Sequence, residues 1–81
     1  MNTETEKKII QTIAEHLSLS PEDVETGALL REDLNLGPIE LNDLLGELSE
    51  RFSITFKPSD VEELKKVEDL IVLVEDNLLE E

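Results

Sequence analysis

The sequence predicts an all-α fold: a four-helix bundle of three long helices and a short third helix, with a long loop between the first two. Two observations carry this prediction. Apolar residues recur at helical spacing in three separate segments, and helix-start signals precede the expected helices. Leu, Ile, Val and Phe together supply 28 of the 81 residues, which is enough apolar material for a modest core. We expect one domain spanning residues 3–79.

The first helix is expected to begin at Thr3 and to end near Leu17 or Ser18. Thr3 followed by Glu6 is a capping-box pattern, in which the threonine oxygen accepts from a free backbone amide and the glutamate reaches back to the cap. Apolar residues then fall on one face at the i, i+3, i+4 spacing. These residues are Ile9, Ile10, Ile13, Ala14 and Leu17.

A long loop is expected between the first and second helices. Ser20 and Pro21 signal a helix start, but no periodic pattern follows them, so we expect one turn at most. Residues 24–36 mix a glycine, acids and isolated leucines, which indicates an ordered loop. The residues expected to pin this loop to the core are Val24, Leu29, Leu30 and Leu34. Loops this long are unusual in a compact domain and often have a function.

The second helix is expected to run from Pro38 to Phe52, with proline at its first position. Its expected buried stripe consists of Ile39, Leu41, Leu44, Leu45, Leu48 and Phe52. Its expected solvent-exposed face carries Glu40, Asp43, Glu47 and Glu50. Gly46, in the middle, costs on the order of 1 kcal/mol relative to alanine. That glycine either allows close approach of another backbone or reflects neutral drift, and drift is the favoured interpretation.

The remaining chain predicts a connector and two further helices. Residues 53–56 are expected to form an extended connector that buries Ile54 or Phe56. A short helix then begins, with either Pro58 at its first position or Ser59 as its cap. The last helix is expected to run from Val67 to Leu79 and to be the most buried one. Its inward residues are Val67, Leu70, Ile71, Val74 and Leu78, with Val72, Leu73 and Leu79 widening the stripe.

The chain is strongly acidic, and this limits its partners. It has 21 Asp and Glu residues against 7 Lys and Arg residues, a formal net charge of −14. This charge repels nucleic-acid phosphates and anionic membranes, so we expect neither as a partner. The expected partner is a basic surface of another protein. The alternative is that the charge merely keeps a small protein soluble, and the two interpretations are compatible.

Residue usage excludes several kinds of chemistry. The chain has no cysteine, which removes disulfides, thiolate metal sites and cysteine nucleophiles. His16 is the only histidine, so there is no histidine cluster or triad, and we expect it to be an exposed helix residue. Acidic pairs such as Glu32-Asp33 lack EF-hand spacing, so no metal site is predicted. The longest apolar run, Leu70 to Val74, is far too short for a membrane span. We expect a cytoplasmic monomer that is not an enzyme.

Several short segments of the sequence resemble the acyl carrier protein family. Glu32-Asp33-Leu34 matches the Glu-Asp-Leu that precedes the second helix of bacterial fatty-acid carriers. Further matching residues are Leu44, Leu48, Glu50, Phe52 and Val67, followed by Glu68-Asp69-Leu70-Ile71. The resemblance spans residues 4–78. Together with length, acidity and helix order, it implies an acyl-carrier-like four-helix bundle.

The resemblance also implies a prosthetic group that this chain is expected to lack. In the family, the serine of an Asp-Ser-Leu motif at the head of the second helix takes a phosphopantetheine arm from coenzyme A, and the thiol of the arm holds acyl groups. This chain reads Gly37-Pro38-Ile39 at the matching place. Proline has no oxygen nucleophile, so Pro38 cannot form the phosphodiester and no cofactor is expected. The helix is spared, because proline is preorganised for the first helical turn and glycine is an acceptable cap.

Other hydroxyl groups are not expected to take the arm. The available ones are Ser18, Ser20, Ser49, Ser53, Ser59, Thr3, Thr5, Thr12, Thr26 and Thr55. None of them lies at the start of the second helix in a setting like Asp-Ser-Leu. We interpret nearly all of them as caps and solvent-facing hydroxyls.

The resemblance further implies a recognition face on the second helix. Family members present exposed apolar side chains to their enzymes at positions matching Ile39, Asn42 and Gly46, and two of these three are not apolar here. The acidic residues of that face remain, as Glu40, Asp43, Glu47 and Glu50. We therefore predict docking onto basic protein grooves, with weakened contacts to fatty-acid enzymes. A simply solvated helix face is the alternative.

Three functions remain open. The leading hypothesis is a non-catalytic interaction module that is shaped like a carrier, lacks the attachment serine and acts through the second helix and the loop before it. The second is a working acyl carrier in lipid or polyketide metabolism, either modified at an unexpected residue or binding acyl ligands non-covalently between its helices. The third is an acidic adaptor or mimic whose resemblance to carriers is architectural only.

Overall fold

The computed structural model describes residues 3–79, without the side chains of residues 3 and 79, and confirms the all-α fold. Its elements are α1 (Thr3–Leu17), the 3-10 helix η1 (Pro21–Asp23), α2 (Pro38–Phe52), α3 (Pro58–Glu62) and α4 (Val67–Leu79). Within this part of the chain, the extended pairing is limited to one isolated bridge between Leu29 and Lys66. No described helix combines the length and apolar character needed to cross a membrane.

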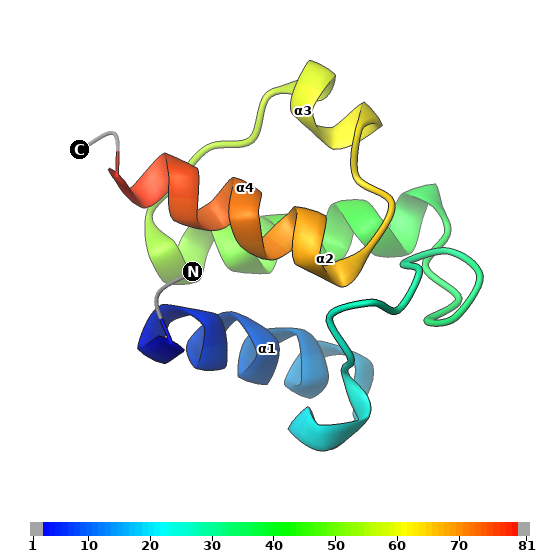
Figure 1. The fold of residues 1–81 in the computed structure, drawn as a ribbon. Coiled ribbons are helices and arrows are strands. Elements are labelled where there is room, and N and C mark those ends of the chain that lie inside the picture. Colours follow the sequence, from blue (N-terminus) through cyan, green and yellow to red (C-terminus); the bar gives the residue numbers. More distant parts are fainter. Residues whose placement is uncertain (1–2, 80–81) are drawn as a thin grey trace.

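The three long helices enclose the core, and the short one lies to one side (Figure 1). Helices α2 and α4 run in the same general direction, whereas α1 runs in the opposite sense beneath them. Helix α1 contacts both of the others. Helix α3 lies on the far side from α1, and the long loop between α1 and α2 passes around one end of the bundle. The start of α2 therefore lies next to this loop.

The core is built from the stripes that the helical periodicity predicted. Eight aliphatic side chains have no exposed surface at all, and they come from α1, α2 and α4. They are Ile9, Ile13, Leu44, Leu48, Val67, Leu70, Ile71 and Val74. Burying each such side chain contributes roughly 1.5–3 kcal/mol, so these three helices hold the fold together.

The long loop is attached to the core as expected. Val24 and Leu30 are buried, and Leu29 and Leu34 are half-buried. Leu36, which the sequence did not single out, is buried as well. Because this last leucine directly precedes Gly37 and Pro38, it anchors the chain just before α2 begins.

Two expected core positions are wrong. Ile39 was assigned to the buried stripe of α2, but 73% of its surface is exposed. It precedes the inward-facing Leu41 by two residues, a rotation of about 200° around the helix, so the two cannot share a face. Val72 was expected to widen the stripe of α4 and is 43% exposed. The same rotation separates Val72 from the buried Leu70 and Val74.

The structure also decides the alternatives at the helix ends. Pro58, not Ser59, begins α3, and Lys57 is its N-cap residue. In the connector before it, Ile54 is buried and Phe56 is half-buried. Helix α1 ends at Leu17, as expected. The capping box predicted at the start of α1 depends on the side chain of residue 3, which lies outside the described ones, as does the side chain of residue 79 in the expected stripe of α4.

Candidate functional site

The first turn of α2 is formed without strain by Gly37 and Pro38. Gly37 is the N-cap residue, with the extended angles φ −76° and ψ −179°, and its carbonyl accepts a hydrogen bond from the Leu41 amide at 2.9 Å. A residue before proline is driven towards such extended angles. Pro38 occupies the first helical position, where a backbone N–H would have had no partner inside the helix. The Gly-Pro pair therefore starts the helix at the position that the sequence predicted.

A cavity of about 810 Å³ opens beside Pro38, between the long loop, α2 and α3. Its apolar lining consists of Leu29, Leu30, Leu36, Pro38, Leu41, Val61 and Leu64. The rest of the lining is Arg31, Glu32, Gly37, Asn42, Glu62 and Lys65. The volume falls in the range of about 300–1,000 Å³ that is typical of small-molecule sites. An apolar ligand group is therefore what this cavity can accommodate.

The lining of this cavity does not fit a covalently attached phosphopantetheine arm. A phosphodiester requires a hydroxyl oxygen, and Pro38 has none. None of the described side chains that line the cavity is a serine, threonine or tyrosine. Among the described residues that line this cavity, no side chain therefore offers a hydroxyl oxygen for such a bond.

Most of the predicted partner-binding residues lie on the surface of α2. Those classed as exposed are Ile39, Glu40, Asn42, Asp43, Gly46 and Glu50. Asp43, Glu47 and Glu50 line one shallow depression together with Arg51. Asn42 and Gly46 lie on the side of α2 that faces α3. The structure thus separates the predicted face into an acidic strip and a second strip beside α3.

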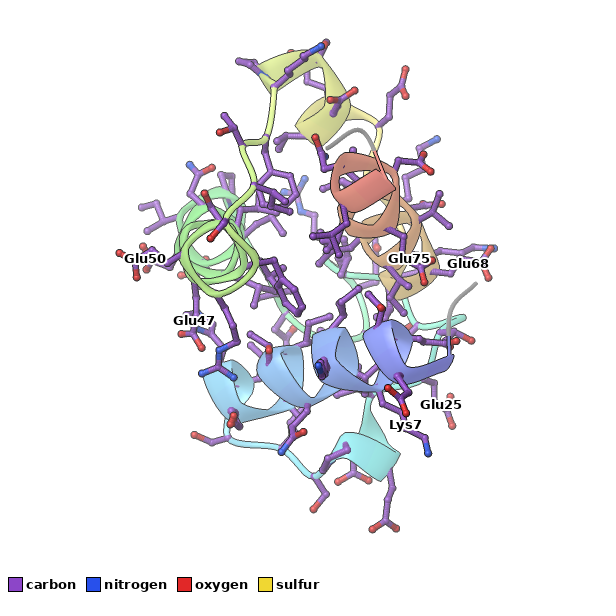
Figure 2. The ribbon with its side chains drawn as sticks, turned by 90° about the vertical axis from the view of Figure 1, so that its left-hand side faces the viewer. Lys7, Glu25, Glu47, Glu50, Glu68 and Glu75 are labelled. Atoms are coloured by element: carbon purple, nitrogen blue, oxygen red, sulfur yellow. The ribbon has the colours of Figure 1, made fainter. Side chains whose placement is uncertain are left out.

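Glu47 differs from the other acidic residues predicted for the partner-binding face because its carboxylate contacts the side chains of His16 and Arg51. His16 Nδ1 lies 3.1 Å from Glu47 Oε1, and Arg51 Nη2 lies 3.7 Å from Glu47 Oε2. The side chain of Glu47 is 35% exposed and that of His16 is 23% exposed. The expectation that His16 is exposed is therefore wrong, because its ring lies against α2. Figure 2 shows Glu47 and Glu50 on the same side of the molecule, with Glu47 the nearer to α1.

Arg51 extends this contact between α1 and α2, and the sequence did not single it out. Its Nη1 lies 3.2 Å from Glu15 Oε1 and donates to Thr12 Oγ1 at 3.3 Å. Thr12 is fully buried, and its hydroxyl donates to the Lys8 carbonyl at 2.8 Å, so it is an exception to the interpretation of nearly all hydroxyl residues as caps or solvent-facing groups. The i, i+4 spacing of Glu47 and Arg51 was a readable signal. The contacts with α1 join residues more than 30 positions apart, so local spacing could not reveal them.

The space next to Gly46, where a side chain would lie, is open. Apart from its chain neighbours and the nearby backbone of α2 itself, no described atom lies within 4 Å of the position that a Cβ would occupy there, and its φ is not positive. The alternative that this glycine allows close approach of another backbone is therefore excluded. Beside it, a shallow hollow of about 520 Å³ separates α2 from α3. The residues that line this hollow are Asn42, Leu45, Gly46, Ser49, Thr55, Phe56, Pro58, Val61 and Glu62.

The fold and the site geometry define a class of carrier-shaped helical proteins, and comparison with known proteins gives the family. A family model described as "Phosphopantetheine attachment site" matches residues 7–74. The acyl carrier protein of Chlamydia trachomatis is 34% identical over 77 residues, covering 95% of this chain and 97% of the relative. That of Nitratidesulfovibrio vulgaris is 32% identical over 69 residues, covering 85% and 91% respectively. The chain belongs to the acyl carrier protein family. A resemblance in architecture alone, as expected for an unrelated acidic adaptor, does not account for this similarity.

Replacing Pro38 should test whether the proline stabilises α2. Pro38→Ser is expected to fold and to lose about 0.4–1 kcal/mol in the free energy of unfolding, because the unfolded chain regains freedom while no hydrogen bond is gained inside the helix. Urea denaturation measures the difference. Pro58→Ser is the matched control, since Pro58 occupies the first position of α3. A gain in stability for Pro38→Ser would show that the proline strains the helix.

Proposed function

We propose that this protein is a non-catalytic interaction module of the acyl carrier protein family that does not carry a phosphopantetheine arm. The observation that supports this is the start of α2, where Pro38 occupies the first helical position and the adjoining cavity is lined by no hydroxyl group among the described residues. In this proposal Pro38 stands at the place of the family's attachment serine. The helix and the neighbouring loop are retained, so in this proposal the protein acts by presenting a binding surface and not by carrying an acyl group.

The proposed partner is an enzyme that binds carriers through a basic surface. Exposed carboxylates at Glu40, Asp43 and Glu50 follow one side of α2, in a chain with a net charge of −14. Charges of this kind steer association with a basic surface and contribute more to the association rate than to affinity. Glu47 contributes less in this proposal, because His16 and Arg51 already contact it. A cytoplasmic monomer acting in fatty-acid or related metabolism is the setting we propose.

The absence of modification can be tested by intact mass. After incubation with coenzyme A and a broadly specific phosphopantetheinyl transferase, the native protein is expected to keep its mass, because Pro38 offers no nucleophile. A conventional acyl carrier protein in the same reaction is the positive control. A mass increase of one phosphopantetheine arm on the native protein would overturn the proposal.

The same reaction tests how much of the carrier remains. The double variant Gly37→Asp with Pro38→Ser is expected to gain the arm. A Cβ built at Gly37 lies 2.6 Å from Glu40 Oε1, so the Glu40 side chain must rotate away, which its flexible end allows. Adding Glu40→Gln removes the repulsion between the two carboxylates and is the appropriate third variant. If both variants fold but stay unmodified, the surface that the transferase recognises has diverged as well.

The docking face can be tested by changing its charge. The double variant Asp43→Asn with Glu50→Gln is expected to weaken binding to a purified carrier-binding enzyme, such as a ketosynthase, by roughly threefold to tenfold at low salt. The loss should shrink as salt screens the charges. The control is Glu25→Gln with Glu68→Gln, which changes the net charge equally at exposed residues away from α2 (Figure 2). Equal losses in both variants would show that only net charge matters.

A second candidate function is the non-covalent binding of an acyl ligand, and the cavity beside Pro38 favours it. Addition of free acyl-pantetheine is then expected to shift the amide resonances of residues 29–36 and 61–65 in a saturable manner, because both segments line the cavity. The amides of α1 in residues 4–10 serve as the internal reference. If no resonance moves at millimolar ligand, where even weak sites of this size would be partly filled, the candidate is ruled out.

A further inference from the structure

The hollow beside Gly46 has an apolar floor that stays open to solvent. Of the apolar residues that line it, Leu45 is buried, and Phe56 and Val61 are half-buried. Pro58, the first residue of α3, also lines it. Because Gly46 has no side chain and no described atom beyond its chain neighbours and the nearby backbone of α2 lies within 4 Å of its missing Cβ, no other part of the described chain fills the space above it. The hollow is therefore a concave apolar feature in the middle of the exposed side of α2.

The charges around the hollow decide which kind of partner fits it. Exposed carboxylates stand on both sides, from Asp43 and Glu50 on α2 and from Glu62 on α3. None of the side chains that line the hollow is a lysine or an arginine. A second copy of this chain would bring its own net charge of −14 against this rim and would be repelled. The complementary partner is basic.

The face also has a protruding residue at a fixed distance from the hollow. Ile39 precedes Gly46 by seven residues, two turns of helix or about 10.5 Å along the axis, and 73% of its surface is exposed. A partner that covers the face therefore meets a projecting isoleucine at the start of α2 and a hollow two turns later. Apolar anchors of this kind supply much of the affinity of an interface, whereas rim charges supply little.

We infer that the hollow beside Gly46 is a socket for one large apolar side chain of a basic segment in the partner. The inference rests on the proposed function and makes it more specific, because it states what the partner must present to the same face of α2. The cationic residues of the segment pair with Asp43, Glu50 and Glu62, while the central apolar side chain displaces water from Leu45, Phe56 and Val61. The chain thus receives an anchor at this position instead of providing one.

The test uses a series of synthetic peptides of about 18 residues, long enough to favour a helix. All carry the same lysines on one face and differ only at the central position of that face, which is alanine, leucine or phenylalanine. Fluorescence anisotropy with the native protein is expected to show that the phenylalanine peptide binds at least about tenfold more tightly than the alanine peptide, because its ring becomes buried. Asp43→Asn with Glu50→Gln should weaken all three peptides alike.

Two matched glycine variants distinguish the socket from a general apolar attraction. Gly46→Leu fills the hollow and is expected to abolish the preference for phenylalanine, while the helix is retained because leucine favours α-helix more than glycine does. Gly27→Leu is the control, since Gly27 is also exposed, has open space at its missing Cβ and lies in the loop away from α2. It should keep the preference.

Three outcomes would overturn the socket. If the native protein binds the three peptides equally but the charge variant weakens them, the docking face stands and the socket fails. If Gly46→Leu keeps the preference, the phenylalanine binds elsewhere. If sedimentation shows that the native protein self-associates and that Gly46→Leu dissociates it, a second copy occupies the hollow. The enzyme-binding and mass measurements above use other readouts, so their failure is separate from these results.

Discussion

The path of the long loop, and with it the surroundings of the candidate site, depends on a set of hydrogen bonds between this loop and the start of α4. The Val67 and Glu68 amides, at the start of α4, donate to the carbonyls of Ala28 and Thr26 at 3.0 Å each. The Leu30 amide donates to the Lys65 carbonyl at 2.8 Å. The first amides of a helix have no partner inside it, so the loop supplies acceptors that α4 needs. In return, α4 gives a long irregular segment a fixed path.

Two side-chain carboxylates, one in the loop and one in α4, add hydrogen bonds to this contact between the loop and α4. Asp33 Oδ2 accepts from the Leu29 amide at 2.8 Å and closes a turn in the loop. Asp69 Oδ2 accepts from the Lys65 and Lys66 amides at 3.1 and 3.0 Å. The position of the loop determines where Leu29, Leu30 and Leu36 point, and these residues form one wall of the cavity beside Pro38. Asp33 and Asp69 thus shape the surroundings of the candidate site through hydrogen bonds that the sequence does not reveal.

The sequence predicted helix positions well because each depends on local chemistry. Proline fixes the first residue of α2, and sustained apolar spacing fixes the extent of α4. The errors at Ile39 and Val72 arose because both residues were assigned to the core from their apolar character, without regard to the side of the helix on which each one lies. The contact of His16 with Glu47 joins different helices, and the open space above Gly46 depends on the placement of α3, so neither was accessible to a local pattern.

Helix α3 connects the two concave features of this protein. It is five residues long and contributes no fully buried residue, so it is the least firmly packed of the described α-helices. Val61 and Glu62 from this helix line both the cavity beside Pro38 and the hollow beside Gly46. An occupant of either space that displaces α3 must change the affinity of the other space, and thermodynamic reciprocity makes the effect equal in both directions. If both spaces are occupied as proposed and either occupant displaces α3, binding in one space is coupled to binding in the other through this helix.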